Sequence, residues 1–356
     1  MKVRFIIREH LEKIERNTLS PHAAFSDSSR GRERPDKQCP IRPIYQHDRD
    51  RIVHSKAFRR LKDKTQVFLS PTGGHYRNRL THTLEVSQIA RTIARALLLN
   101  EQLTEAIAMG HDIGHTPFGH SGERALARLL SGGFRHEEQS LRVVEKLARH
   151  GRGLNLSYEV RNGILMHSKG RGKLIKKEGL PATLEGQIVR LADIIAYVNH
   201  DIDDAVSGGL LTEHEIPYTD VLGRGISERI NRMVIDVIRT TTEALNAGDI
   251  RILMSENMAR AVEETRDFLY EKVYEAPIIR REFDKAERVI QSLFRYFREH
   301  YEELPSYYHP FVDPEPERNI ADFIASLTDS YAIALYQRLF MPERMPYPDL
   351  DNVDEK

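Results

Sequence analysis

The sequence has a single cysteine, Cys39, no tryptophan and no long apolar run. One cysteine cannot form an intramolecular disulfide, and a thiolate metal site is not expected either. No stretch approaches the roughly 20 apolar residues that a membrane-spanning helix needs, and the N-terminus has no apolar signal core. We therefore expect a soluble, cytoplasmic protein of 356 residues that can bury a sizeable core.

Neither sign of charge is in excess, because Lys and Arg total 53, as do Asp and Glu. A formal net charge of zero argues against a protein that mainly coats nucleic acid or anionic lipid. A local basic patch is still compatible with this balance. Residues 168–181 could form such a patch for phosphate or DNA, or simply a solvated loop, since they include Lys169, Arg171, Lys173, Lys176 and Lys177.

Apolar residues recur at three- and four-residue spacing through most of the chain, and alternating strand patterns are scarce. This periodicity predicts an all-α fold with helices over 80–98, 104–113, 121–130, 137–148, 184–205, 229–245, 256–274, 281–301 and 320–339. Residues 19–43 are rich in Ser, Arg and Pro and are expected to be irregular. We divide the chain into an N-terminal arm (1–45), a catalytic core (46–250), a C-terminal helical region packed on the core (251–340) and a tail (341–356).

The run HDIGHTPFGHSGE, residues 111–123, is the most informative stretch of the sequence. It places three imidazoles and two carboxylates within thirteen positions, from His111, Asp112, His115, His120 and Glu123. Neutral imidazole and carboxylate are the ligands that bind divalent metals at neutral pH. A bound metal can polarise a phosphoryl group or activate water, so the run predicts a metal-dependent hydrolase.

Two other segments offer partners for a metal held by His111 and Asp112. His82 lies on the apolar stripe of its predicted helix; alone, it would be read as a hydrogen-bonded core histidine. Asp193 lies in an otherwise apolar helix, where an unpaired carboxylate would be costly to bury. Three further aspartates compete for its role but occupy a more polar helix end, where solvation explains them better: Asp201, Asp203 and Asp204. Nitrogen and oxygen ligands without sulfur favour Mn²⁺, Fe²⁺ or Mg²⁺ over a structural zinc.

The segment from His111 to His115 also mimics the His-Glu-x-x-His helix of zinc proteases, with aspartate in place of glutamate. Gly114 at the fourth position and Pro117 two residues after the second histidine weaken this interpretation. The shorter acid weakens it further.

The order His82, His111-Asp112, Asp193 resembles the metal motif of the HD-domain phosphohydrolases. Within that superfamily the chain resembles the deoxyguanosinetriphosphate triphosphohydrolase-like family. The resemblance covers most of the chain and rests on residues 47–51, 54–66, 79–82, 111–123, 134–137, 193–204, 301–305 and 320–339. It implies an HD-domain helical core with a C-terminal helical extension. It also implies hydrolysis of dGTP, or of dNTPs generally, to deoxynucleoside and intact triphosphate.

The resemblance further implies roles for individual residues. One divalent metal (Mn²⁺, Mg²⁺ or Fe²⁺) would lie beside the α-phosphate on His82, His111, Asp112 and Asp193. The catalytic pair would be His120 and Glu123. His115 and His136 would line the triphosphate pocket, and His115 is also grouped with the catalytic residues. Arg79 and Gln66 would contact the nucleotide. Tyr197 and Asp201 would contact the deoxyribose.

Spacing agrees with several of these roles. Glu123 lies three residues after His120, close enough on a helix for its carboxylate to orient the imidazole. Arg79 precedes His82 by one turn and can place a permanent cation beside phosphate oxygens. Tyr197 lies one turn after the proposed metal ligand on its helix. A ring packed under a deoxyribose would resist an added 2′-hydroxyl.

Simpler interpretations exist for the same residues. Tyr197 could be an ordinary core residue, and Arg79 could pair with Glu85 or another carboxylate at the surface. In some relatives a lysine follows the metal-binding aspartate, whereas this chain has Ile194. Any phosphate contact of that lysine must therefore be absent or come from elsewhere.

Two other functions are compatible with the same motifs. One keeps the fold and metal but acts on nucleoside monophosphates, although several basic residues near the site suit a longer phosphate chain better. The other is a low-turnover regulator that binds nucleotide or single-stranded DNA. The resemblance also predicts a homo-oligomer and a second nucleotide as a possible activator.

Overall fold

The computed structural model describes residues 7–66, 77–168, 174, 178–308 and 314–342. These residues form helices, short helical turns and loops, with two isolated β-bridges, Arg32–Ser157 and Thr65–Asn78, in place of strands. The all-α prediction is therefore confirmed. None of the helices in the described ranges is long and apolar enough to cross a membrane.

The helices follow one another closely along the chain. The first half contains α1 (Arg8–Thr18), α2 (Ile44–Val53), α3 (Lys56–Arg60), α4 (Arg79–Ala96), α5 (Glu101–Gly110), α6 (Gly119–Leu129), α7 (His136–Arg142), α8 (Ala148–Gly151) and α9 (Tyr158–Met166). The second half contains α10 (Leu184–Ser207), α11 (Thr219–Leu222), α12 (Gly225–Asn246), α13 (Glu256–Leu269), α14 (Pro277–Glu299), α15 (Pro316–Ser326) and α16 (Asp329–Phe340). Five-residue π-helical turns extend α7 and α13, over Val143–Leu147 and Tyr270–Tyr274.

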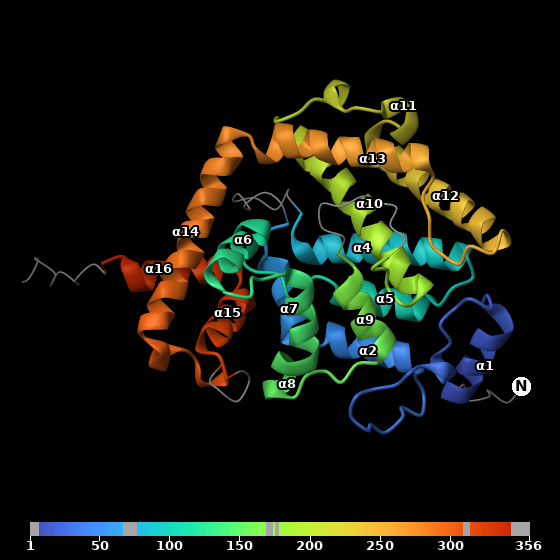
Figure 1. The fold of residues 1–356 in the computed structure, drawn as a ribbon, viewed down its shortest axis with the longest axis horizontal. Helices are drawn as coiled ribbons and strands as arrows, with labels where there is room; N and C mark the ends of the chain where they lie inside the picture. The colour runs from blue at the N-terminus through green and yellow to red at the C-terminus, as the bar shows by residue number, and fades with distance from the viewer. Residues whose placement is uncertain (1–6, 67–76, 169–173, 175–177, 309–313, 343–356) are drawn as a thin grey trace, which may run out of the picture.

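A first apolar core is built around α4, α5 and α10 (Figure 1). Helices α2 and α9 pack on α5, and α12 packs on α10. Capping side chains define where the central helices begin: Asn78 for α4, Asn100 for α5 and Thr183 for α10. Three helices that are far apart in sequence thus present their adjoining faces to one another.

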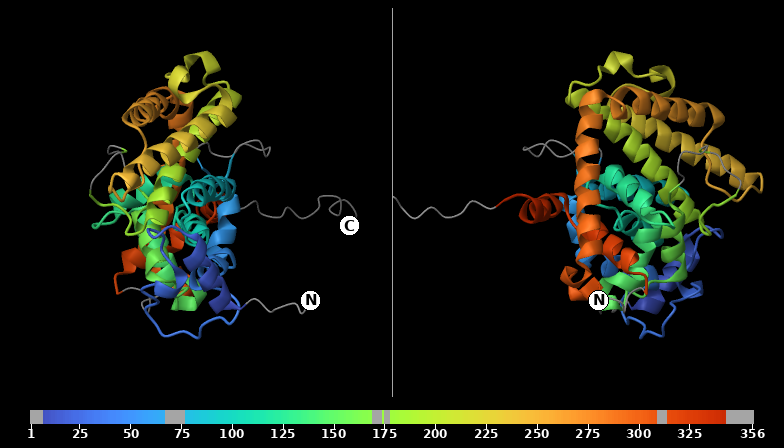
Figure 2. Two further views of the ribbon diagram at one scale, coloured as in Figure 1. Left: turned by 90° about the vertical axis from the view of Figure 1, so that its right-hand side faces the viewer. Right: turned by 60° about the vertical axis from the view of Figure 1, so that its left-hand side comes forward.

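A second apolar core joins α6 to the C-terminal helices α14, α15 and α16. Helix α14 runs from the end of α13 down one side of the molecule, where α6 and α15 pack against it (Figures 1 and 2). Phe118, from the histidine-rich run, is buried in this second core. His111 begins the same run beside the first core, so the run passes from one core to the other.

Several predicted helix boundaries differ from the structure. The stretch 320–339 forms two helices, because Leu327 is extended and the Thr328 side chain caps a new helix by accepting the N–H of Tyr331. Helix α5 ends at Gly110, so His111 and Asp112 lie in the turn that follows it. Helices α1, α2, α3, α9 and α11 were not predicted. The five basic residues predicted for the 168–181 loop and most of the tail lie outside the described residues.

Candidate active site

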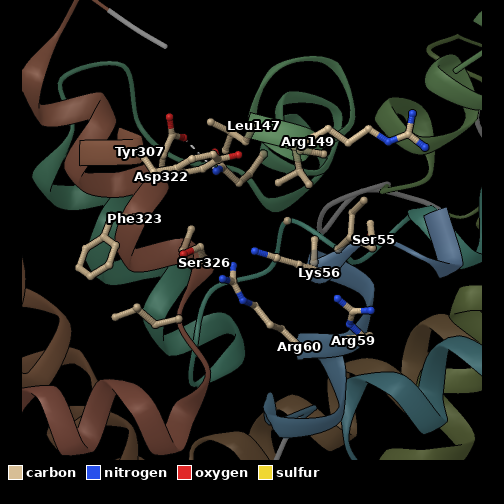
Figure 3. Close-up of a pocket in the computed structure, with 18 of the residues that line it drawn as sticks. Ser55, Lys56, Arg59, Arg60, Leu147, Arg149, Tyr307, Asp322, Phe323 and Ser326 are labelled. Atoms are coloured by element: carbon tan, nitrogen blue, oxygen red, sulfur yellow. Dashed lines mark hydrogen bonds between the residues drawn. The ribbon is translucent and has the colours of Figure 1, made fainter. Parts of the chain in front are cut away.

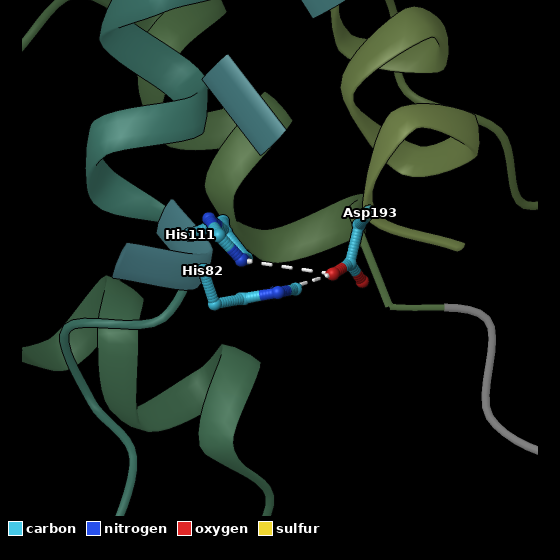
Figure 4. Close-up of side chains that lie close together, drawn as sticks. All are labelled: His82, His111 and Asp193. Atoms are coloured by element: carbon cyan, nitrogen blue, oxygen red, sulfur yellow. Dashed lines mark hydrogen bonds and ion pairs between the residues drawn. The ribbon is translucent and has the colours of Figure 1, made fainter. Parts of the chain in front are cut away.

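Helices α4, α5 and α10 bring together His82, His111 and Asp193 (Figure 4). Nε2 of His82 lies 3.0 Å from Oδ1 of Asp193. Nε2 of His111 lies 3.8 Å from the same oxygen. One ligand atom from each side chain falls within 4.8 Å of the others, a spacing that suits a single metal ion.

The protonation of His111 can be read from its contacts. Its Nδ1 lies 2.7 Å from the carbonyl oxygen of Ala108, so Nδ1 carries the proton and donates it. Nε2 is then left with a lone pair; it is buried and has no hydrogen-bond partner among the described residues. A bare imidazole nitrogen beside a carboxylate is the donor set of a divalent-metal site, so these residues fit such an ion.

Asp112 lies at the edge of this triad and is shared with Arg79. Its Oδ2 accepts a 2.6 Å hydrogen bond from the buried Arg79 guanidinium, and its Oδ1 lies 3.6 Å from Nε2 of His111. By proximity Asp112 groups with His115 and His136 rather than with the triad. The alternative pairing of Arg79 with Glu85 at the surface is not formed, because the arginine is buried against Asp112.

Glu123 connects two histidines. Its Oε2 lies 3.0 Å from Nδ1 of His120, whose side chain is 68% exposed. Its Oε1 lies 3.0 Å from Nδ1 of His136 and accepts the backbone N–H of that residue at 2.8 Å. Burial lowers the pKa of His136, but the Glu123 carboxylate outweighs it and raises the pKa to about 9. The pair therefore places an imidazolium inside the site at neutral pH.

Two further histidines pack against His136. The rings of His115 and His136 are stacked, with centroids 4.2 Å apart. Nε2 of His167, at the end of α9, lies 3.3 Å from Nε2 of His136. Burial and the neighbouring His111 and His136 lower the pKa of His167 to about 4. Sequence reasoning missed His167, because nothing in its own helix indicates which residues it faces.

A close backbone approach holds the run against α7. The Ser140 hydroxyl donates to the carbonyl oxygen of His111 at 2.7 Å and accepts the N–H of Gly114 at 3.0 Å. A Cβ at Gly114 would lie 2.1 Å from the Ser140 nitrogen, so only glycine fits there. This contact places His136, the first residue of α7, beside the run.

A left-handed turn directs the next part of the run. Phe118 has φ of 61° and Gly119 has φ of 55°, and the Thr116 hydroxyl donates to the Gly119 carbonyl at 2.9 Å. Helix α6 starts at this turn and carries His120 and Glu123. The turn therefore determines where the predicted catalytic pair, His120 and Glu123, points.

A buried lysine is hydrogen-bonded to the backbone of the run. Lys64 is 2% exposed; its ammonium group donates to the carbonyl oxygen of His115 and, at 2.7 Å, to that of Ala325 at the end of α15. Burial, reinforced by nearby Arg60, lowers the pKa of Lys64 to about 7. No sequence pattern indicated this lysine.

The remaining predicted substrate contacts are Asp201, Tyr197 and Gln66. Asp201 is buried and accepts the hydroxyl of Tyr274; burial raises its pKa to about 8. Tyr197, one turn before it on α10, is partly buried. Gln66 is buried; its backbone carbonyl oxygen accepts a 3.5 Å hydrogen bond from Arg79, whereas its side-chain oxygen has no partner among the described residues.

One expectation at this end of α10 is wrong. Solvation was the favoured explanation for its aspartates, but Asp201 and Asp204 are buried. The Arg77 guanidinium donates to Asp203 and Asp204, each at 2.8 Å. A distant arginine thus supplies the charge compensation that solvent was expected to provide.

A cavity of about 850 Å³ is lined by residues of both apolar cores (Figure 3). Its wall includes Lys64 and Gly114 but none of the three triad residues. Besides Lys64, six basic residues line it: Arg51, Lys56, Arg59, Arg60, Arg149 and Arg152. Tyr307 adds an aromatic surface.

Comparisons with known proteins agree on the family of the chain. The HD domain family matches residues 79–198, and the phosphohydrolase-associated domain matches residues 252–338. A protein of Caldanaerobacter subterraneus subsp. tengcongensis is 52% identical over 94% of this chain and 96% of its own length. A relative from Desulfatibacillum aliphaticivorans is 49% identical over 95% of this chain and 99% of its own length. One from Clostridium tetani is 45% identical over 96% of this chain and 98% of its own length. All three are named deoxyguanosinetriphosphate triphosphohydrolase-like proteins.

Proposed function

The chain belongs to the deoxyguanosinetriphosphate triphosphohydrolase-like family of HD-domain proteins, and we propose that it hydrolyses dNTPs to deoxynucleoside and triphosphate. Membership of this family supports a phosphohydrolase activity. The identity of the substrate and of the bond that is cleaved are our proposal. The observation that carries it is a connected group of metal-binding and cationic side chains. A metal-ligand triad lies beside a buried arginine and a cluster of histidines, one of them cationic.

A divalent cation (Mn²⁺, Mg²⁺ or Fe²⁺) would be held by His82, His111 and Asp193, with Asp112 as the fourth ligand. When bound, such a cation supplies Lewis acidity at the α-phosphorus and lowers the pKa of water. Every ligand donates through nitrogen or oxygen, which these hard or borderline metals accept.

The other residues bind phosphate and move protons. Arg79 and the His136 imidazolium offer fixed positive charge to the phosphate oxygens, and His115 stacks beside them. Water adds to the α-phosphorus while the bond to the 5′-oxygen breaks. The 5′-oxygen gains a proton as it leaves. His120, oriented by Glu123, exchanges protons with the reacting oxygens.

Selection of a deoxyribose is assigned to α10. Tyr197 and Asp201 lie on the helix that carries Asp193, one and two turns further along. A tyrosine ring under the sugar leaves no room for a 2′-hydroxyl. The hydrogen bond from the Tyr274 hydroxyl to Asp201 fixes the Asp201 carboxylate at the far end of this helix face.

The proposal is tested by product analysis of purified protein with Mn²⁺ and each dNTP, singly and mixed, with Asp112→Ala as control. Deoxynucleoside plus triphosphate, lost in the control, is the expected result. Release of orthophosphate from nucleoside monophosphates instead would favour the phosphatase. No turnover from folded, metal-loaded protein would favour a binding role, which filter binding with single-stranded DNA at two salt concentrations would then examine.

Two further parts of the proposal concern partners. We propose that a second nucleotide acts as an activator, and the cationic cavity supports this because its seven Lys and Arg residues and three tyrosines suit phosphates and a base. We also propose a homo-oligomer. Light scattering should give a mass that is a multiple of 41.1 kDa, and a mass near 41.1 kDa itself would contradict it.

A further inference from the structure

Behind the metal-ligand triad, a chain of polar contacts leads from His82 toward the surface. Nδ1 of His82 lies 3.3 Å from Nδ1 of His200, a buried residue of α10. Nε2 of His200 lies 2.8 Å from Oε2 of Glu85, on α4. Asp193 and His200 are seven residues apart on α10, so both lie on the face that meets α4. Neither His200 nor Glu85 was among the predicted site residues.

These contacts determine where the protons lie. An imidazole nitrogen 2.8 Å from a carboxylate oxygen is repelled by it unless the nitrogen is protonated, so we place the proton of a neutral His200 on Nε2. A neutral imidazole has one N–H, and Nδ1 of His200 is therefore an acceptor. The facing Nδ1 of His82 must then be the donor. A neutral His82, whose one N–H points at His200, therefore carries a lone pair on Nε2.

That lone pair points at the proposed metal position. Nε2 of His82 faces the Asp193 carboxylate at 3.0 Å, so two electron-pair donors point at each other. Such an arrangement is unfavourable unless a cation lies between them. The second ligand, His111, has the same tautomer, but a backbone carbonyl sets it there. Only His82 depends on side chains for its tautomer.

We propose that Glu85 and His200 are positioning residues that hold His82 in its metal-binding tautomer and orientation. This rests on the proposed metal site, although it does not depend on the substrate. Outer-shell partners of ligating histidines fix the ring and raise the basicity of the ligand nitrogen. Arg77 holds Glu85 in turn, since its Nε lies 3.4 Å from Oε1 of Glu85. The guanidinium also anchors the end of α10 through two aspartates.

The test is the affinity of the whole protein for Mn²⁺, measured by the electron paramagnetic resonance signal of the free ion. We expect Glu85→Ala to raise the Kd for Mn²⁺ about 10- to 100-fold, the range typical of outer-shell changes. Glu85→Gln should lie between it and the wild type, because the amide oxygen still accepts from His200 without the negative charge. The absorption spectrum of the Co²⁺-loaded protein should change in the same order.

Glu101→Ala is the matched control. It removes the same charge from α5, where the carboxylate pairs with Arg95 at 2.8 Å and Arg91 at 3.4 Å. Its Kd should equal that of the wild type. The Glu85 side chain is 40% exposed, so the substitution is compatible with folding, which Tm measurements will check.

The outcomes separate this inference from the proposed reaction. Equal Mn²⁺ affinity in the wild type and Glu85→Ala would overturn the inference even if the enzyme is active. A wild type that binds no Mn²⁺ would overturn it together with the metal site. Tight wild-type binding without production of triphosphate would reject only the substrate, and the affinities would still decide the role of Glu85.

Discussion

Oδ1 of Asp329 accepts a hydrogen bond from the backbone N–H of Phe118 at 2.9 Å. Oδ2 of the same carboxylate accepts the N–H of Thr65, also at 2.9 Å, and the Thr65 hydroxyl. Asp329 is the first residue of α16, whereas Phe118 forms the left-handed turn that starts α6. A C-terminal helix thus holds the turn that directs His120.

Asp329→Ala is therefore expected to reduce kcat while Mn²⁺ affinity is unchanged. The substitution leaves buried N–H groups without an acceptor, which costs about 1–3 kcal/mol. A misplacement of His120 that loses ~1.4 kcal/mol of transition-state stabilisation lowers kcat about tenfold. Steady-state kinetics and Mn²⁺ titration check this beside Asp284→Ala, an exposed change on α14. An unaltered kcat would mean that the turn holds without Asp329.

The Glu123 carboxylate sets the charge of His136, and this gives a pH prediction. The imidazolium exists below its pKa, so in the wild type it persists through neutral pH and is lost near pH 9. In Glu123→Gln the raising charge is gone, and the pKa of His136 falls. The alkaline limb of kcat/KM should therefore move to lower pH, and kcat should fall by about 10²-fold or more. Glu138→Gln, at an exposed position, should leave the profile in place.

Lys64 should make stability depend on pH with a defined sign. Its pKa is about 7 in the folded protein against an ordinary value of 10.5. Between these values the unfolded chain binds more protons, so the free energy of unfolding rises with pH. Lys64→Met lacks this rise. Chemical denaturation at several pH values across the interval should show the wild type gaining stability over the variant; a constant difference would rule the explanation out.

The basic cavity should be required for activation by a second nucleotide. Lys56→Ala combined with Arg59→Ala removes two cations from its wall. The concentration of activator needed for half-maximal effect should rise about tenfold or more, the value of one to two charged hydrogen bonds. Hydrolysis without activator should be preserved. Arg295→Ala, an exposed change on α14, serves as control; identical activation curves for all three proteins would remove the cavity from the proposal.

Periodicity predicted those parts of the fold that depend on one helix at a time. The predicted 80–98 and 184–205 lie within two residues of α4 and α10 at each end. His82 and Asp193 could be singled out because a polar side chain on an apolar helix face needs a reason to be there. The proximity of these two side chains then follows from the packing of α4 against α10.

The rest depends on contacts between segments distant in sequence. Asp201 lay within a predicted helix and Arg79 directly before one, but their partners, Tyr274 and Asp112, come from other parts of the chain. Lys64 shows most clearly what sequence alone cannot predict, since a lysine in a segment rich in basic residues is normally solvated. Only the folded chain reveals that its ammonium group is buried between two carbonyl oxygens.

The supports of the run at Ala325 and Asp329 affect how this enzyme could be divided or recombined. A fragment ending near residue 250 would keep every proposed metal ligand, yet it would lose both supports and the apolar partners of Phe118. Such a fragment could still bind a metal ion, but His120 and Glu123 would no longer be held in position. Exchange of C-terminal regions between relatives would accordingly change turnover as well as stability, because the C-terminal helices hold the run that carries the proposed catalytic pair.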